Sequence, residues 1–516
     1  MKTKMKKNAP NILVIMFDQL APQCLSCYGH PLVKSPNIDA LAENGVLFEN
    51  SYTNFPLCVP SRASFMAGRY ANSLEVWDNA TDFSCSTPTI PHYLRSQGYS
   101  ATLCGKMHFI GPDQMHGFEQ RLVTDVYPSN FAWTPDWNEG PHNRPTGINM
   151  RAVVDSGTCI RSLQIDYDDE VEFFAHQKLY DLVRFSEEQP FFLMVSFTHP
   201  HSPFIVRKEF WDRYDHNDIT LPKVPTIPLD EQDEMSRWLH YAHGGDLDDV
   251  TDEHVRNARH AYYGMISYCD DKVGRIMATL DEVGLTDDTI VIFTSDHGEM
   301  LGERGGWYKQ YFYEWSSRIP LIVSCPSRFK QARVEENVSL ADILPTVMDL
   351  ATNNGDWEAV APLDGNSLTA MLDGDSAKWD DTVISEYTGE GACAPCRMIR
   401  RGFHKLIYTH GFPDLLYDLE ADPDELENLA EDAAHSKLLK ELRDALLKDW
   451  NPDEINDRIL RSQRDRRFIQ DTTGGEPTWA FKLREDDDRR YVRNSGAVQT
   501  KAKARYPFIA PPPIGK

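Results

Sequence analysis

The sequence predicts an α/β protein: a large, mostly parallel sheet sandwiched by helices, followed by a smaller C-terminal α+β subdomain and an extended tail. Short apolar runs rich in Val, Ile, Leu and Phe alternate with longer helical patterns, which is typical of a parallel sheet covered on both faces. Polar residues directly follow several of these runs, as expected where strand ends form a binding edge. With 516 residues, 41% of them hydrophobic, the chain can bury one large core and a smaller companion.

Six apolar runs have the length and composition of buried strands. In chain order they are residues 11–17, 46–52, 100–103, 191–197, 289–294 and 320–323. Helical spacing of apolar residues lies between them. These expected helices are residues 37–44, where Gly45 ends the pattern, and two long segments near 169–188 and 252–283.

The alternation of strands and helices predicts a catalytic α/β domain over residues 1–380 and a small-sheet subdomain with a helix over residues 381–450. Residues 451–516 are charged, contain a proline run near their end and carry little core-forming pattern. We expect them to form an extended tail that contacts another subunit of a homo-oligomer, either a dimer or a tetramer. The elements expected in the subdomain are short strands at 384–387, 398–400 and 404–409 and a helix near 434–449.

The composition argues against several classes of function. Lys and Arg number 53 against 79 Asp and Glu, a net charge of −26, which disfavours nucleic-acid binding because a phosphate backbone needs a basic face. No apolar run approaches the roughly 18 to 20 residues that cross a bilayer. The basic N-terminus leads into a short apolar run that stops at Asp18 without a cleavage site, so we expect neither a signal peptide nor a membrane partner.

The ten cysteines are sparse and scattered, which predicts reduced thiols and a cytoplasmic location rather than a disulfide scaffold. Two pairs have C-x-x-C spacing, Cys24/Cys27 and Cys393/Cys396. The pairs are far apart in the chain and no His follows either at ligand spacing, so we do not expect a zinc site.

Chemistry-bearing residues follow four of the apolar runs. Because the carboxyl ends of parallel strands meet at one edge of a sheet, we expect these four segments to lie together. Their carboxylate, amide, imidazole and amine groups suit the binding of a metal or an anion. The segments are Asp18-Gln19, Gly105-Lys106-Met107-His108, Thr198-His199-Pro200-His201 and Asp296-His297-Gly298.

The stretch around Cys58 predicts a nucleophile at the start of a helix. Pro60 and Ser61 favour a helix opening, and Gly68 is a natural C-terminal stop. Cys58 is therefore expected just before a helix N-terminus, where backbone N–H groups and the helix dipole favour anions. Arg62 lies one turn further along the same helix.

The motif C-x-P-S-R at Cys58–Arg62, followed by A-S and G-R, resembles the sulfatase signature. A longer stretch, Gly105 to Gln114 followed by H-G-F-E from His116, is similar to the bacterial choline sulfatase branch of that family. The resemblance implies an alkaline-phosphatase-like fold and conversion of Cys58 to formylglycine by a maturation enzyme. The hydrated aldehyde of formylglycine would be the nucleophile, and a small-molecule sulfate ester would be the substrate.

The resemblance also implies roles for individual side chains. Arg62, Lys106 and Lys309 would neutralise the sulfuryl oxygens. His108 would be the base that removes a proton from the sulfated hydrate, and His201 and Lys309 would protonate the leaving alcohol.

A divalent metal is implied as well. Its carboxylate and amide ligands suit calcium or magnesium, while an imidazole ligand favours manganese. We expect calcium, with manganese or magnesium as alternatives. The implied ligands are Asp18, Gln19, Cys58, Asp296 and His297.

Choline sulfate is the substrate that the resemblance implies. Its quaternary ammonium group donates no hydrogen bonds, so aromatic faces and a carboxylate must hold it. The expected pocket residues are Asn79, Trp133, Glu386 and Glu390, with Tyr127 and Trp137 in the same aromatic-rich region. The alternatives are a phosphonate monoester or phosphodiester hydrolase of the same superfamily, a sulfatase for another small organic sulfate, and a catalytically silent binding protein.

Overall fold

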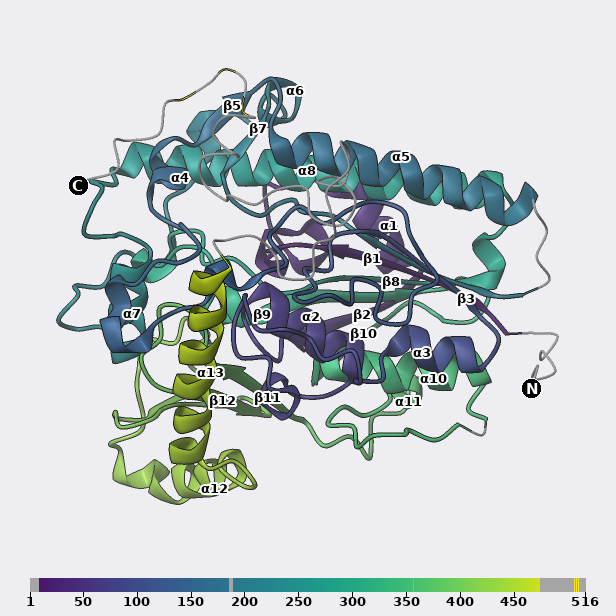
Figure 1. Ribbon diagram of the computed structural model, residues 1–516. Coiled ribbons are helices and arrows are strands. Elements are labelled where there is room, and N and C mark those ends of the chain that lie inside the picture. The colour runs from purple at the N-terminus through teal and green to yellow at the C-terminus, as the bar shows by residue number, and fades with distance from the viewer. Residues whose placement is uncertain are drawn as a thin grey trace.

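The computed structural model describes residues 9–184, 189–355 and 357–473, together with residues 505, 507 and 509. Over these residues the chain forms an eight-stranded sheet, a four-stranded sheet and a small two-stranded sheet. The eight-stranded sheet lies between two layers of helices, and the four-stranded sheet lies beside it (Figure 1). This architecture confirms the predicted fold class.

The large sheet is mostly parallel, as predicted. Its order is β10-β2-β9-β8-β1-β6-β3-β4, and only β9 runs antiparallel to its neighbours. The sequence pattern does not predict β10, because this edge strand is partly exposed and two Glu residues interrupt its apolar positions. The strands are β1 (Asn11–Phe17), β2 (Gly45–Tyr52), β3 (Ser100–Gly105), β4 (Gln120–Arg121), β6 (Phe191–Ser196), β8 (Thr289–Ser295), β9 (Arg318–Ser324) and β10 (Ala332–Ser339).

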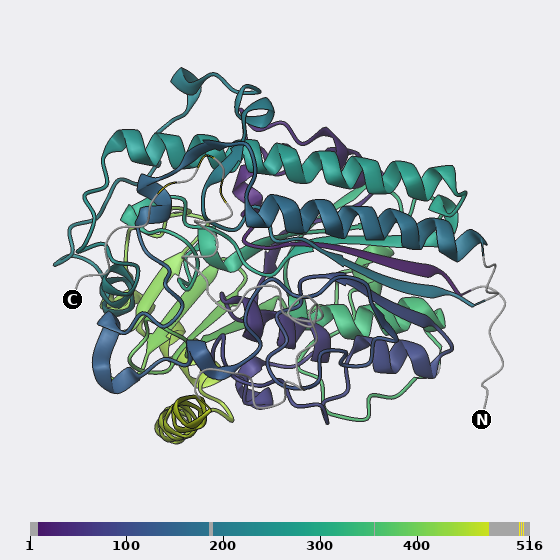
Figure 2. The same ribbon diagram turned by 45° about the horizontal axis from the view of Figure 1, so that its top comes forward.

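Helices cover both faces of this sheet. One layer consists of α1 (Pro36–Glu43), α5 (Leu163–Arg184) and α8 (Asp252–Glu282), and the other of α2 (Cys58–Ala67), α3 (Ile90–Ser96), α10 (Ile343–Thr352) and α11 (Thr369–Leu372). Leu13 and Ile15 of β1 pack against the first layer, whereas Ile12 and Val14 pack against the second. Helices α5 and α8 run side by side across their face (Figure 2). Burial of β1 from both sides explains its unbroken apolar run.

Short elements fill the long connections around β6 and β8. Strands β5 and β7 pair in parallel to form the two-stranded sheet. These elements are α4 (Arg151–Val154), β5 (Gly157–Cys159), β7 (Ile205–Arg207), α6 (Lys208–Trp211), α7 (Glu234–Ala242) and α9 (Glu314–Ser317).

The C-terminal region contains an antiparallel sheet in the order β11-β12-β13-β14. Helix α12 packs against this sheet through Leu442 and Leu446, which are fully buried in its apolar core. The strands and the helix are β11 (Thr382–Tyr387), β12 (Cys396–Arg401), β13 (His404–Thr409), β14 (Leu415–Asp418) and α12 (Ser436–Leu446).

The first part of the predicted extended tail is a helix instead. Helix α13 (Pro452–Thr472) is 21 residues long, and the side chain of Asn451 caps its N-terminus. Its apolar contacts are narrow, because Ile455 and Ile459 are its only buried apolar residues in the part of the chain that the structure describes. Most of the tail (residues 474–504, 506, 508 and 510–516) lies outside the described residues, so subunit contacts by the tail stay a prediction.

The adjacent parallel strands β3, β6, β1 and β8 end at the same edge of the sheet. Phe17 of β1 is in register with Ser295 of β8, and Gly105 of β3 is in register with Ser196 of β6. The residues that follow these strands therefore gather at one place, as the sequence predicts. Among the described residues, no helix has the length and apolar character needed to span a membrane.

Candidate active site

Cys58 is the first residue of α2, at the edge where β1 and β8 end. Leu57 before it is extended, with φ −156°, and Gly68 ends the helix in the left-handed conformation, with φ 63°. In the first turn, the backbone N–H of Val59 donates to Oδ1 of Asn79 at 3.0 Å. The Cys58 side chain, only 2% exposed, thus lies at a helix N-terminus, where N–H groups favour anions.

Four of the predicted metal ligands form one buried cluster. One ligand atom from each of Asp18, Cys58, Asp296 and His297 lies within 4.8 Å of the others. Sγ of Cys58 is 3.3 Å from Nε2 of His297 and 3.8 Å from Oδ1 of Asp18. Adjacency of β1 and β8 brings the two carboxylates together, and the start of α2 brings the cysteine to them.

Gln19, the fifth predicted ligand, lies against the cluster and is held from several sides. Its backbone N–H donates to Oδ1 of Asp296 at 3.1 Å. Its Nε2 donates to the carboxylate of Glu299, and its Oε1 accepts from Nζ of Lys309 at 2.6 Å. These contacts fix which side-chain atom of Gln19 is the oxygen.

Three cationic side chains surround the cluster. Nε of Arg62 donates to Oδ2 of Asp296 at 2.8 Å, and its Nη1 donates to the carbonyl of Lys106 and to Oγ of Ser196, each at 2.8 Å. Nη2 of Arg62 is buried without a hydrogen-bond partner in the described part of the chain. Nζ of Lys106 pairs with the Asp18 carboxylate. Together with Lys309 they form a positive site that suits an anion.

His108 is a buried, neutral imidazole. Burial, together with the charge of Lys106, holds its pKa well below the usual value. Its backbone N–H donates to Oδ2 of Asp125 at 2.7 Å, whereas both ring nitrogens lack partners among the described residues. The rings of Tyr127 and Trp133 lie 5.1 and 5.6 Å from its own, centroid to centroid. An unpaired neutral imidazole can accept a proton.

His201 contacts Lys309, whereas His199 is a structural residue. Nδ1 of His201 lies 2.6 Å from the carbonyl of Ser202, and its Nε2 lies 2.6 Å from Nζ of Lys309. This pattern assigns the ring proton to Nδ1 and leaves Nε2 to accept from the lysine. Nδ1 of His199 bonds Oδ2 of Asp168 at 2.7 Å.

Two of the predicted pocket residues, Asn79 and Glu390, are linked. Nδ2 of Asn79 donates to Oε1 of Glu390 at 3.3 Å. Burial raises the pKa of Glu390 to about 7, and its Oε2 has no partner among the described residues. Glu386 differs, because it is buried in an ion pair with Arg397, 3.2 Å away, and accepts a hydrogen bond from the backbone N–H of Asn72.

The donor atoms of the cluster fit a divalent cation. Burial lowers the pKa of His297 to about 3, so its ring is neutral and has a lone pair for a metal. Although burial opposes ionisation of Asp296, the guanidinium of Arg62 holds its pKa below the usual range. Oxygen and imidazole ligands of this kind suit calcium, magnesium or manganese.

The thiol of Cys58 is a poor nucleophile in this setting. Burial raises its pKa to about 11. At neutral pH the side chain is therefore almost entirely protonated, and the thiolate is the reactive form.

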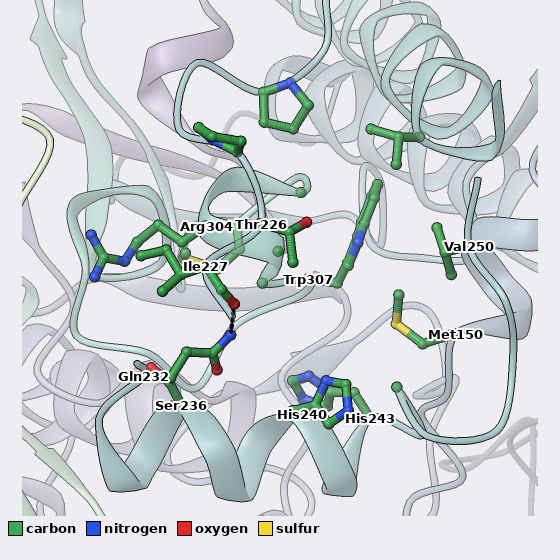
Figure 3. Close-up of a pocket in the computed structure, with 18 of the residues that line it drawn as sticks. Met150, Thr226, Ile227, Gln232, Ser236, His240, His243, Val250, Arg304 and Trp307 are labelled. Carbon is green, nitrogen blue, oxygen red and sulfur yellow. Dashed lines mark hydrogen bonds between the residues drawn. The ribbon is translucent and has the colours of Figure 1, made fainter. Parts of the chain in front are cut away.

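A separate cavity of about 420 Å³ lies between α7 and the loop after β8. Figure 3 shows His240 and His243 on one side of it and Trp307 and Thr226 on another. His243 bonds the side chain of Gln310, the neighbour of Lys309. None of the site residues predicted from the sequence lines this cavity.

Three supporting residues are absent from the sequence-based prediction. Asp125 anchors the His108 loop, Ser196 bonds Arg62, and Glu299 orients Gln19. Glu299 follows Asp296-His297-Gly298 directly, so its place beside the predicted ligands is a signal that could have found it. Asp125 and Ser196 carry no comparable signal.

Two family models match the chain. The Sulfatase model matches residues 10–353, a range that contains nearly all of the residues described above. A model described as N-sulphoglucosamine sulphohydrolase, C-terminal, matches residues 302–451, which include the four-stranded sheet and α12.

Individual relatives cover almost the whole chain. A choline-sulfatase of Rhizobium meliloti is 41% identical over 515 residues, which cover 98% of this chain and 99% of the relative. An arylsulfatase of Clostridium perfringens is 27% identical and covers 85% of this chain and 94% of the relative. Among solved structures, the phosphonate monoester hydrolase of Agrobacterium radiobacter has a TM-score of 0.68 and 28% identity to this chain. The match covers 85% of this chain and 95% of the hydrolase chain.

The buried cluster generates a prediction about metal removal. Treatment with EDTA should lower the thermal midpoint of unfolding, and added calcium should restore it. A free cation at a concentration of 100 times its Kd raises the free energy of unfolding by about 2.7 kcal/mol. Differential scanning calorimetry of the purified protein measures both shifts.

A variant pair tests whether the effect arises at this cluster. Asp18→Asn should lose the response to calcium, whereas Asp166→Asn, which changes a carboxylate paired with Arg161 at the surface, should keep it. An unchanged midpoint after chelation and after addition of calcium, magnesium or manganese would contradict a metal site here.

Proposed function

The chain belongs to the sulfatase family, and we propose that it hydrolyses choline sulfate to choline and sulfate. The proposal rests on one observation: a group of positive side chains and a separate carboxyl group both lie near Cys58. Arg62 and the two lysines contact the strand-end loops, whereas Glu390 contacts Asn79 behind the first turn of α2. A substrate with an anionic sulfate and a cationic organic group is complementary to this arrangement. The 41% identity to a choline-sulfatase over nearly the full chain supports the same choice.

The sulfate group would bind to the positive site. Nη2 of Arg62, which is buried and has no partner in the portion of the chain that the structure describes, offers a hydrogen-bond donor, and Lys106 and Lys309 add positive charge. In a buried site such donors stabilise the charge that develops on the transferred group far more than they would in water.

The nucleophile would come from Cys58. In sulfatases a cysteine at this position is converted to formylglycine, whose hydrated aldehyde supplies the attacking oxygen. The high pKa of the buried thiol agrees with a need for this conversion. We therefore propose that a formylglycine-generating maturation enzyme acts on this chain before it folds.

Proton transfer would use His108 and Lys309. His108 is neutral, and neither of its ring nitrogens has a partner within the described part of the chain; it would accept a proton from the sulfated hydrate at position 58. Lys309, which donates to Nε2 of His201, would give a proton to the oxygen of the leaving alcohol, with His201 holding it in place. An alkyl alcohol leaves poorly, and general-acid help contributes on the order of 100- to 10,000-fold.

The choline group would bind between aromatic rings and a carboxylate. Trp133 and Tyr127 pack against each other and against His108, and aromatic rings of this kind attract a quaternary ammonium. Nζ of Lys106 already lies 4.3 Å from the centroid of the Tyr127 ring, so we expect Trp133 to be the ring that receives the cation. Oε2 of Glu390 has no hydrogen-bond partner among the described residues, which makes Glu390 a better partner for this cation than Glu386, whose carboxylate already pairs with Arg397.

Further proposals concern the cation and the assembly. We propose calcium as the metal, held by Asp18, Gln19, Asp296, His297 and the residue at position 58, with manganese or magnesium as alternatives. We also propose a cytoplasmic homo-oligomer, a dimer or tetramer. The ten unpaired cysteines support a reducing compartment, and the exposed Phe468 and Ile469 on α13 support contact with another subunit.

A second candidate function is phosphonate monoester or phosphodiester hydrolysis. The phosphonate monoester hydrolase with a TM-score of 0.68 favours it, because one charge clamp can serve phosphoryl and sulfuryl centres alike. Hydrolysis of another small organic sulfate is a third candidate. The carboxylate of Glu390 and the rings beside His108 favour the cationic substrate over both.

Comparison of three substrates tests the proposed function. We expect kcat/KM for choline sulfate to exceed that for an aryl sulfate and that for a phenyl phosphonate monoester. Trp133→Ala should lower kcat/KM for choline sulfate about tenfold, because loss of a cation–π contact of ~1 to 2 kcal/mol has this effect. Faster phosphonate hydrolysis would overturn the proposal, and an equal loss on the aryl sulfate would remove Trp133 from the choline site.

The raised pKa of Glu390 generates a prediction about pH. Its carboxylate is neutral below about pH 7 and charged above it, and the quaternary ammonium group keeps its charge at every pH. KM for choline sulfate should therefore fall as the pH rises through about 7. Steady-state kinetics between pH 6 and 8.5, a range of roughly two units around that pKa, would measure it.

Glu390→Gln removes the titrating group with little change of shape. Above about pH 7, the variant should have a higher KM for choline sulfate than the unaltered protein. Between about pH 6 and 8.5 the KM of the variant should stay constant. The aryl sulfate, which lacks the cation, serves as control and should show no such dependence in either protein. An unchanged pH profile in Glu390→Gln would exclude Glu390 as the partner of the cation.

A further inference from the structure

Helix α13 contacts two separate segments that carry predicted pocket residues. Oε1 of Gln463 accepts from the backbone N–H of Trp137 at 3.1 Å, and Arg467 pairs with Asp136. Arg466 lies on the same side of the helix and reaches both segments at once. Figure 1 shows α13 as an upright helix at the front of the molecule, and this helix contacts the short turn Phe131–Trp133.

Arg466 forms a fork-shaped ion pair with Asp78. Nη1 donates to Oδ1 and Nη2 donates to Oδ2, each at 2.7 Å. The two side chains are 6% and 0% exposed, so water screens the pair little. Nη1 also donates to Oγ1 of Thr134 at 3.1 Å. Planar two-point pairing of this kind fixes the orientation as well as the distance of the carboxylate.

Both partners of Arg466 adjoin residues of the proposed choline pocket. Asp78 precedes Asn79, whose side chain joins the first turn of α2 to Glu390. Thr134 follows Trp133, whose ring lies against His108. One guanidinium thus joins the loop of Asn79 to the segment of Trp133.

Asp78 depends on this guanidinium. Its Oδ1 also accepts from the backbone N–H of Ala80 at 2.9 Å and from Oγ1 of Thr81 at 3.0 Å. Arg466 is the only cation paired with Asp78 among the described residues. Without Arg466, the buried carboxylate of Asp78 would have no cationic partner among the described residues. It also lies close enough to Glu390 for its charge to add to the effect of burial in raising the pKa of Glu390. The loop that carries Asp78 would have to shift, either so that water reaches the carboxyl groups of Asp78 and Glu390 or so that the two groups move apart.

We propose that Arg466 is a positioning residue for the organic end of the substrate: its contacts with Asp78 and Thr134 set the spacing between the Asn79–Glu390 pair and Trp133. This inference rests on the proposed function, in which these residues receive the choline group. The C-terminal helix, through Arg466, then controls binding of the alcohol part of the ester and leaves the sulfate site around Arg62 unchanged.

Steady-state kinetics of Arg466→Gln tests the proposal. We expect KM for choline sulfate to rise about tenfold or more, while kcat changes far less, because the sulfate-binding and proton-transferring residues stay in place. Arg464→Gln is the matched control on the same helix, since Arg464 is 72% exposed and pairs only with its neighbour Asp465 in the described part of the chain. It should behave as the unaltered protein.

A double variant separates positioning from general destabilisation. Asp78→Asn alone should raise KM because it leaves Arg466 without its charged partner. Asp78→Asn/Arg466→Gln places two neutral amides opposite each other and should recover much of the affinity, which is the non-additivity expected of residues in direct contact. If Arg466→Gln does not fold, Arg466→Lys, which keeps the charge but not the fork, replaces it and should give an intermediate KM.

These measurements distinguish a failure of the proposed function from a failure of the role proposed for Arg466. The series is measured on whichever ester the unaltered protein hydrolyses, so absent turnover of choline sulfate counts against the proposed function alone. Equal KM in Arg466→Gln and the unaltered protein would overturn the role of Arg466. A fall in kcat at constant KM, or strictly additive effects in the double variant, would overturn it too.

Discussion

The ion pair between Arg62 and Asp296 holds the first turns of α2 against the ends of β1 and β8, and the rest of the site depends on it. Both side chains are fully buried, 2.8 Å apart, and Ser61 of the same helix donates to the backbone carbonyl of Asp296. Removing one member of such a pair costs about 3–5 kcal/mol because the other charge is left buried. The pair therefore fixes Cys58 beside the carboxylates.

The same arrangement explains why so many charges can be buried together. Asp18 pairs with Lys106 and Asp296 with Arg62, while the low pKa of His297 keeps that ring uncharged. The positive groups thus offset the carboxylates and still offer donors to an incoming anion. The encoded thiol is the one group unsuited to its position, because burial keeps it protonated.

Residues whose positions follow from backbone topology were predictable from the sequence. Asp18, Lys106, His201 and Asp296 follow strands whose ends must meet, and a helix start places Cys58. Residues that act through tertiary contacts were not predictable, because Asp125 and Arg466 come from segments with no strand-end signal. Helix α13 was missed because its apolar stripe is narrow, although Asn451 followed by Pro452 is a recognisable helix start. The domain limits and most of the tail stay predictions.

The identity of the side chain at position 58 tests the central claim most directly. Trypsin releases residues 35–62 as one peptide, and its mass can be measured in protein isolated with its maturation enzyme and active on a sulfate ester. The account predicts an aldehyde or its hydrate in place of the thiol. A fully active preparation whose peptide carries only the unmodified cysteine would contradict it.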